Sequence, residues 1–183
     1  MLCSRRELLI SFLQNRNIVI LTKKTQVIYM LVAIRYHFAQ ILSAPAQKAY
    51  EWCTTFTNED YVIMNKVNAE RQVTHLAEGT MILTDVFHSN GNVVKQKLVQ
   101  LYPERLHWTS THLSGPNRYS QFVYEISPVN EFESKLDFYG LHVENAKERL
   151  SQTSMRMLAK KECKADSNVW KLLAKAMASE LRK

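Results

Sequence analysis

Hydrophobic and polar residues alternate along residues 66–144 in short runs, and each run is closed by a turn signal. The turn signals are Glu78-Gly79, Ser89–Asn92, Tyr102–Glu104, Ser114–Asn117 and Ser127–Asn130. The runs between them are about ten residues long, which suits antiparallel strands joined by hairpins. Asn90-Gly91 is the strongest signal because both residues tolerate the positive φ angles of a two-residue turn. The pattern predicts a meander of six antiparallel strands.

The same alternation predicts which residues share a face, because successive side chains of a strand point to opposite sides. Three largely apolar sets are expected on one face: Met81, Leu83, Asp85 and Phe87; Phe122, Tyr124 and Ile126; and Phe132, Ser134, Leu136 and Phe138. Polar residues interrupt these sets. Each unsatisfied polar group in a dry core costs about 1–3 kcal/mol, whereas a pocket accommodates a few of them. The predicted apolar face therefore suits a pocket.

The segment before the meander is predicted to add one strand and two short helices. Residues 31–42 alternate as a strand, with Ile34, Tyr36 and Phe38 on one side. Ser43-Ala44-Pro45 then supplies a capping hydroxyl and a proline, which favour the start of a helix that runs through Cys53. A second helix is expected from residue 58 to residue 64.

The end of the chain is predicted to be helical. Residues 145–164 have a helix-forming composition, and Asp166-Ser167 is a predicted cap. Beyond it, apolar residues recur at spacings of three and four: Val169, Trp170, Leu173, Ala176, Met177 and Leu181. Burial of Trp170, Leu173 and Met177 would contribute roughly 1.5–3 kcal/mol each. We expect this helix to lie against the concave side of the sheet.

Residues 1–29 are interpreted as an N-terminal extension, and residues 30–183 as one domain. The apolar run after Arg5 and Arg6 resembles a signal peptide, but polar residues 14–17 interrupt it and no small-residue cleavage site follows. The apolar run 27–34 is too short for a bilayer, which needs about 20 residues. No membrane span is expected. A helix over residues 4–14 and a strand over residues 18–21 are alternatives that the sequence pattern does not decide.

The net charge of +7 is unevenly distributed. Lys and Arg outnumber acids by five to one in residues 1–29 and by ten to five in residues 144–183, whereas residues 30–143 carry nine against eleven. A basic sheet platform for nucleic acid is therefore not supported. Cys3, Cys53 and Cys163 are far apart, which indicates a reducing, cytoplasmic setting without a disulfide framework.

In this order, the predicted elements resemble those of the START-like or SRPBCC superfamily, which has the α+β helix-grip fold. The most specific local piece is a first strand that ends in Ser43-Ala44-Pro45 and leads into Ala49–Trp52. Birch-pollen allergens, lipid-transfer START domains and polyketide cyclases or dehydratases belong to this group. The resemblance covers residues 30–183. It implies a curved seven-stranded antiparallel sheet around the C-terminal helix, with an apolar cavity between them.

The resemblance does not extend to a catalytic site. The glycine-rich loop of the plant allergens is absent, and no residue set matches a cyclase, hydrolase or Rieske-oxygenase site. His107 and His112 would face opposite ways on one strand, so no metal site is expected. Because no nucleophile elbow or phosphate-binding loop occurs, neither catalytic residues nor a cofactor are predicted.

Eight residues form the candidate ligand-binding set: Asp85, Phe87, Tyr124, Leu136, Phe138, Trp170, Leu173 and Met177. The apolar members could instead fill a core. Asp85 is the most informative of the set, because a buried carboxylate needs a cation such as Arg71, or its pKa rises. It could then anchor a ligand or transfer protons. The simpler interpretation is that the register is misread and Asp85 faces solvent.

The leading hypothesis is a protein that binds or transports a small hydrophobic ligand, such as a lipid, a polyketide-like or an aromatic molecule. Tyr124 or Asp85 would supply hydrogen bonds. The alternative is a polyketide cyclase or dehydratase in which Asp85, a histidine or Tyr124 moves protons. A third hypothesis is a partner-binding module that uses the basic helical ends. The basic face of the last helix is expected in solvent, with peripheral contact to an anionic membrane as the alternative.

Overall fold

One antiparallel sheet dominates the computed structural model, which describes residues 30–66, 68–89 and 91–182. Its strand order is β1-β7-β6-β5-β4-β3-β2. The strands are β1 (Met30–Leu42), β2 (Ala69–Ala77), β3 (Thr80–Ser89), β4 (Gly91–Tyr102), β5 (His107–His112), β6 (Gln121–Pro128) and β7 (Ser134–Ala146). The helices are α2 (Ala46–Cys53), α3 (Glu59–Ile63) and α4 (Gln152–Glu180), with a short 3-10 turn η1 (Pro103–Arg105). The predicted six-strand meander and the added first strand are confirmed.

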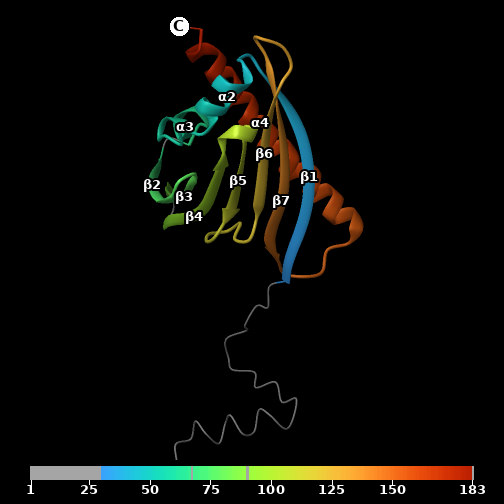
Figure 1. The fold of residues 1–183 in the computed structure, drawn as a ribbon. Coiled ribbons are helices and arrows are strands. Elements are labelled where there is room, and N and C mark those ends of the chain that lie inside the picture. Colours follow the sequence, from blue (N-terminus) through green and yellow to red (C-terminus); the bar gives the residue numbers. More distant parts are fainter. Residues whose placement is uncertain (1–29, 67, 90, 183) are drawn as a thin grey trace, which may run out of the picture.

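The sheet curves, and the long helix α4 crosses it diagonally from beyond β1 to α2 and α3 (Figure 1). Ser151 caps this helix, because its hydroxyl accepts a hydrogen bond of 3.1 Å from the backbone N–H of Ser154. Trp170, Ala174 and Met177 are the buried residues of α4. The apolar stripe predicted from the sequence therefore places α4 against the sheet. Among the described residues, no helix has the length and apolar content needed to cross a bilayer.

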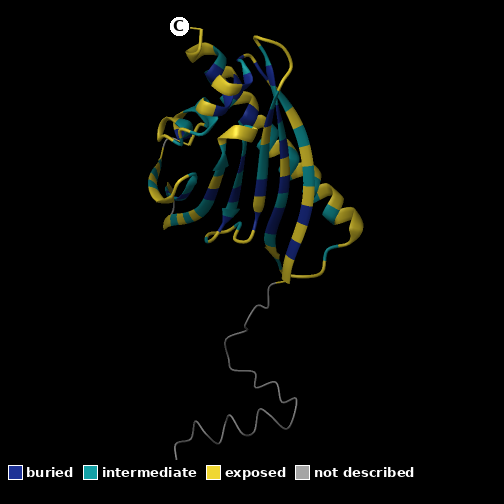
Figure 2. Cartoon of the chain, viewed as in Figure 1, coloured by how far each residue is buried: buried dark blue, intermediate teal, exposed yellow. Residues whose placement is uncertain are grey.

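Buried and exposed residues alternate along the strands, visible as dark and light bands in Figure 2. On β5 the inward residues are Trp108, Ser110 and His112. The turn between β2 and β3 has one position that only glycine fits: Gly79 has φ +64°, and a Cβ there would lie 3.0 Å from the carbonyl oxygen of Leu101. Local turn chemistry and the two-residue period together fix which side chains face α4.

Several sequence predictions were wrong in detail. Phe132 does not belong to the last strand; it is 70% exposed in the turn that precedes β7. Residues up to Ala146 continue β7 instead of starting a helix, because they pair with β1 as far as Met30. Asp166 and Ser167 lie inside α4 and do not cap it. Strand pairing thus overrode the helix-forming composition of this segment. The predictions for residues 1–29 lie outside the described residues.

Candidate ligand-binding cavity

A cavity of about 260 Å³ lies between the inner face of the sheet and α4. Residues of β2 to β7, of α4 and of the α2–α3 segment line it. Because the strands pair in register, the inward residues of neighbouring strands form rows across the sheet. The row that contains Trp108, Tyr124 and Phe138 is aromatic. Lys95 lies in a polar row with Asp85 and Arg71, and Lys97 lies between Leu83 and His112.

Four aromatic side chains, Trp108, Tyr124, Phe138 and Trp170, form a group that we call the aromatic box. Trp108 and Tyr124 stack with ring centroids 4.6 Å apart and planes inclined by 3°. Tyr124 meets Phe138 edge-on at 5.1 Å. Trp170 of α4 lies 5.8 Å from Tyr124 and 6.3 Å from Trp108. All four line the cavity and can offer apolar surface and π-faces to a planar molecule.

Five of the eight predicted ligand-binding residues line the cavity: Phe87, Tyr124, Phe138, Trp170 and Leu173. Leu136 and Met177 do not line it, because both are fully buried in the packed core. Asp85 is also fully buried and lies behind the cavity wall. The interpretation that placed Asp85 in solvent was therefore wrong. A ligand-binding role for the eight residues remains a prediction.

Asp85 holds a buried ion-pair network together. The Nε of Arg71 donates to its Oδ1 at 2.8 Å, and the Nζ of Lys97 lies 2.5 Å from its Oδ2. Arg71 also donates to Asp60 at 2.7 Å and to the hydroxyl of Tyr61 at 2.9 Å. Burial opposes ionisation of Asp85, but Lys97 and Arg71 outweigh it and lower its pKa to about 2. Asp85 is thus an ionised anchor for two cavity-wall cations, and its low pKa argues against proton transfer near neutral pH.

Tyr36 and Asp166 form a second polar pair beside the cavity. The Tyr36 hydroxyl on β1 donates to the Oδ2 of Asp166 on α4 at 2.5 Å. Burial raises the pKa of Asp166, although the Tyr36 hydrogen bond and nearby His142 act in the opposite direction. Gly140 on β7 makes room for the Tyr36 ring, since a Cβ at that position would lie 2.7 Å from it. Asp166 and His142 both line the cavity.

His112 places a ring nitrogen without a partner in this region. It faces inward at the end of β5, and within residues 30–66, 68–89 and 91–182 its Nδ1 has no hydrogen-bond partner. Burial lowers the pKa of His112 to about 3, and the charges of Lys97 and Lys95 act in the same direction. The ring is therefore neutral at physiological pH. In the same described ranges, no cluster of three His, Cys, Asp or Glu residues could hold a metal ion.

Sequence reasoning missed several cavity residues. Trp108 was overlooked because the alternation is blurred around β5, and Asp166 because it was interpreted as a helix cap. Lys95 and Lys97 were overlooked as well. They are spaced two residues apart along β4 and therefore share a face of the strand with buried Val99. Two lysines on the apolar side of a strand were the signal that could have identified them.

No protein-family model and no curated protein sequence matches the chain. Solved structures do. The Zhui aromatase/cyclase from Streptomyces is 13% identical with a TM-score of 0.58, and the match covers 79% of this chain and 94% of that one. Norcoclaurine synthase from Thalictrum flavum, solved with dopamine and hydroxybenzaldehyde, is 10% identical with a TM-score of 0.58, covering 81% and 88%. The di-domain ARO/CYC StfQ of the steffimycin biosynthetic pathway is 11% identical with a TM-score of 0.63, covering 82% and 52%.

At these identities the likeness shows the fold. The chain has the helix-grip fold, as the resemblance implied. The shared architecture is the curved seven-stranded antiparallel sheet, the two short helices after β1 and the long C-terminal helix.

Proposed function

We propose that this helix-grip protein binds a small, mainly aromatic ligand in the cavity between its sheet and α4. The aromatic box is the observation that carries the proposal, because four rings from β5, β6, β7 and α4 surround space that protein atoms do not fill. The fold neighbours support it: two are named as aromatase/cyclases, and norcoclaurine synthase was solved with two aromatic molecules.

The size of the cavity favours a compact molecule. Small-molecule sites usually measure about 300–1,000 Å³, and this cavity of about 260 Å³ lies just below that range. A molecule of a few fused or linked rings fits such a volume better than an extended lipid chain. Planar rings also match the stacking geometry of Trp108 and Tyr124.

The polar groups of the cavity favour an occupant over a dry core. An unsatisfied buried donor or acceptor costs about 1–3 kcal/mol, and the unpartnered Nδ1 of His112 is such a group. A ligand that accepts from or donates to this nitrogen would remove the cost. Ser110 also lines the cavity, one alternate position away on the same face of β5.

Titration with the neutral fluorophore N-phenyl-1-naphthylamine tests the proposal. We expect saturable one-to-one binding with a dissociation constant of about 10 μM or tighter. All three tryptophans of the chain line the cavity, so binding should also quench their emission. If the probe shows no saturable signal up to its solubility limit, the proposed binding function fails.

A second candidate function, acid–base catalysis on the bound molecule, is favoured by the Tyr36–Asp166 pair. A general acid works best when its pKa is near the working pH, and burial raises the pKa of Asp166 on the cavity wall. This alternative assigns proton transfer to Asp166, not to Asp85.

The Asp166→Asn variant separates the two candidates. If the protein cyclises a linear β-polyketone, followed by absorbance, the variant should lower turnover at least about 100-fold. Its affinity for the neutral fluorophore should stay within about twofold of wild type, because asparagine preserves the shape of the side chain. Unchanged turnover in the variant would rule out the catalytic role of Asp166.

A further inference from the structure

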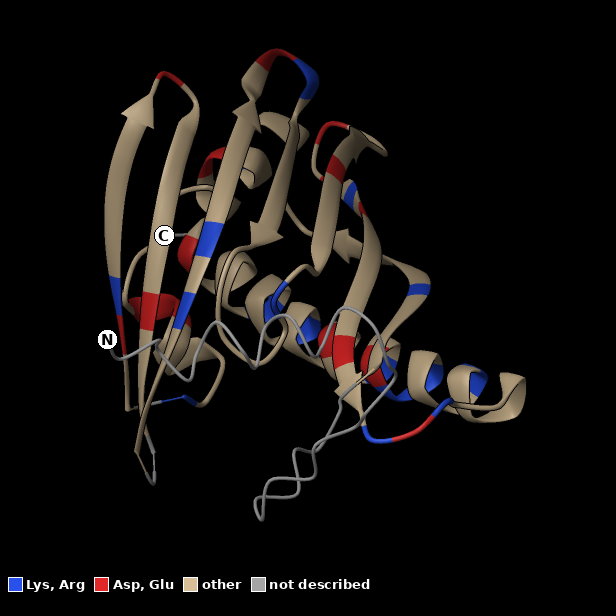
Figure 3. Ribbon diagram, turned by 90° about the horizontal axis from the view of Figure 1, so that it is seen from below, with Lys and Arg blue, Asp and Glu red and all other residues tan. Residues whose placement is uncertain are grey.

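The cavity has a cationic wall, which we define as Lys66, Arg71, Lys95 and Lys97. Arg71 projects from β2, Lys95 and Lys97 project from β4, and Lys66 lies between α3 and β2. The blue and red bands of neighbouring strands in Figure 3 show how basic and acidic positions alternate across this end of the sheet. The network contains two carboxylates, Asp60 and Asp85, against these four cations. The cationic wall therefore carries positive charge in excess of its internal counter-charges.

Two of the four cations are already engaged. Arg71 uses Nε, Nη1 and Nη2 on Asp85, Asp60 and Tyr61. Lys97 forms an ion pair with the second carboxylate oxygen of Asp85. Lys95 is the register partner of Asp85, yet the ion pair forms with Lys97 instead. In the described part of the chain, neither Lys95 nor Lys66 has a carboxylate within ion-pair distance.

The two remaining lysines converge on one ring. The Nζ of Lys66 lies 5.7 Å from the centroid of Phe87, and the Nζ of Lys95 lies 5.2 Å from it. Burial lowers the pKa of Lys95, and the like charge of Lys66 lowers it further. The cation–π contacts with Phe87 offset part of the free-energy cost of holding two ammonium groups close together. An anion that contacts both groups would relieve their mutual repulsion more fully.

The other carboxylates of the cavity wall form no ion pair with Lys66 or Lys95 among the described residues, although the charge of Lys66 acts to lower the pKa of Asp166. Glu162 and Asp166 both lie on α4. Glu162 is 3.2 Å from the Nζ of Lys161, and Asp166 accepts the hydroxyl of Tyr36. Among the described residues, no carboxylate is left to pair with Lys66 or Lys95, and a bound ligand is a candidate partner.

We infer that the ligand carries an oxyanion, a carboxylate or a phosphate, bound between Lys66 and Lys95, with its aromatic body in the aromatic box. The inference rests on the ligand-binding function proposed above and names the chemical class of the ligand. Charge-assisted hydrogen bonds to an oxyanion are about twice as strong as neutral ones. The cationic wall would therefore select an aromatic acid over the corresponding neutral compound.

Two fluorophores with the same anilinonaphthalene body test this inference. 8-Anilinonaphthalene-1-sulfonate carries an anionic group, whereas N-phenyl-1-naphthylamine does not. The double variant Lys66→Gln/Lys95→Gln should weaken sulfonate binding at least about tenfold, because both charge-assisted contacts are lost. Its affinity for the neutral fluorophore should stay within about twofold. Displacement of one probe by the other establishes that they share the site.

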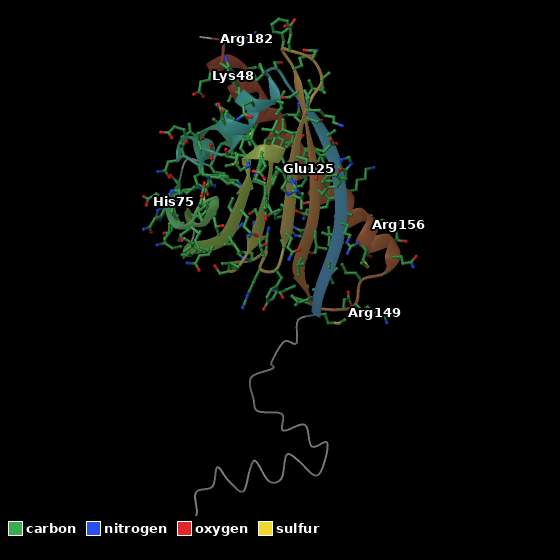
Figure 4. All side chains as sticks on the ribbon, in the orientation of Figure 1. Lys48, His75, Glu125, Arg149, Arg156 and Arg182 are labelled. Atoms are coloured by element: carbon green, nitrogen blue, oxygen red, sulfur yellow. The ribbon has the colours of Figure 1, made fainter. Side chains whose placement is uncertain are left out.

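Lys48→Gln is the matched control, since Lys48 is exposed on the outer surface of α2 (Figure 4). This variant should leave both affinities unchanged, and thermal melts should show that all variants fold. Equal weakening of both probes by the double variant, or unchanged sulfonate affinity, would overturn the oxyanion inference and leave the binding function intact. Failure of the wild type to bind the neutral probe would instead remove the proposed function itself.

Discussion

The Asp85→Asn variant is expected to lose about 3 kcal/mol of its free energy of unfolding, since removal of one partner leaves buried charges uncompensated. Asp85 is fully buried and contacts both Arg71 and Lys97. Asparagine has nearly the same size and can accept a hydrogen bond, but it cannot neutralise the two cations. Urea unfolding at neutral pH measures the loss.

Asp137→Asn is the matched control for this experiment. Asp137 is paired with Lys135 and His37 at the surface, where ion pairs contribute about 0–1 kcal/mol. The control variant should therefore lose less than about 1 kcal/mol. Equal losses in the two variants would show that the Asp85 network has no special structural role.

The same carboxylate should make stability depend on pH in acid. The pKa of Asp85 is about 2 in the folded protein, against an ordinary value of 3.8. A carboxyl with a lowered folded-state pKa contributes its full stabilisation above the unfolded-state pKa and loses it as pH falls through the folded-state value. We expect about 2 kcal/mol to disappear between about pH 4 and pH 2. The Asn variant lacks this dependence, so the difference in stability between the two proteins should narrow over that window.

The Ser110→Phe variant is expected to weaken binding of the neutral fluorophore at least about 30-fold, because the added ring would occupy the cavity. Ser110 is buried on the inward face of β5, where its register partners are Val99 and Phe122. Ser110 and both partners line the cavity. Fluorescence titration of the variant and the wild type measures the change.

Thr109→Phe provides the comparison on the same strand. Thr109 is the residue before Ser110 and points to the opposite face of the sheet, so an added ring there does not reach the cavity. The affinity of the Thr109→Phe variant for the neutral fluorophore should equal that of the wild type. Melting curves of both variants are needed because overpacking costs about 1–3 kcal/mol. Unaltered affinity in a folded Ser110→Phe variant would place the binding site elsewhere.

The fold was predictable from the sequence because its signals are local. Turn residues and a two-residue period define the strands, and a spacing of three and four residues defines the buried face of α4. Tyr124 and Phe138 were placed correctly on the inner face for this reason. Asp166 was misread because its partner, Tyr36, lies 130 residues away. Ser167 tolerates the helix interior because its hydroxyl donates to the carbonyl of Lys164 at 3.1 Å.

Core and cavity could not be separated from the sequence alone. Both need an apolar inner face, so Leu136 and Phe138 give the same signal although only Phe138 lines the cavity. The difference depends on α2, which contacts β6 and β7 and belongs to the same packed core as Leu136. Arg71 was named from the sequence as a cation for a buried Asp85, and the register that places Arg71 opposite Asp85 brings the two together. Lys97 was missed, because its contact with Asp85 depends on how β4 pairs with β3.

Native mass spectrometry of the protein purified from its own source tests the central claim most directly, with the Ser110→Phe variant expressed and purified in parallel. The account predicts that the wild type carries one noncovalently bound molecule of a few hundred daltons, released on activation, and that the variant carries none. A wild type that has the mass of the bare polypeptide, or the same bound mass on both proteins, would contradict the claim that this cavity holds a ligand.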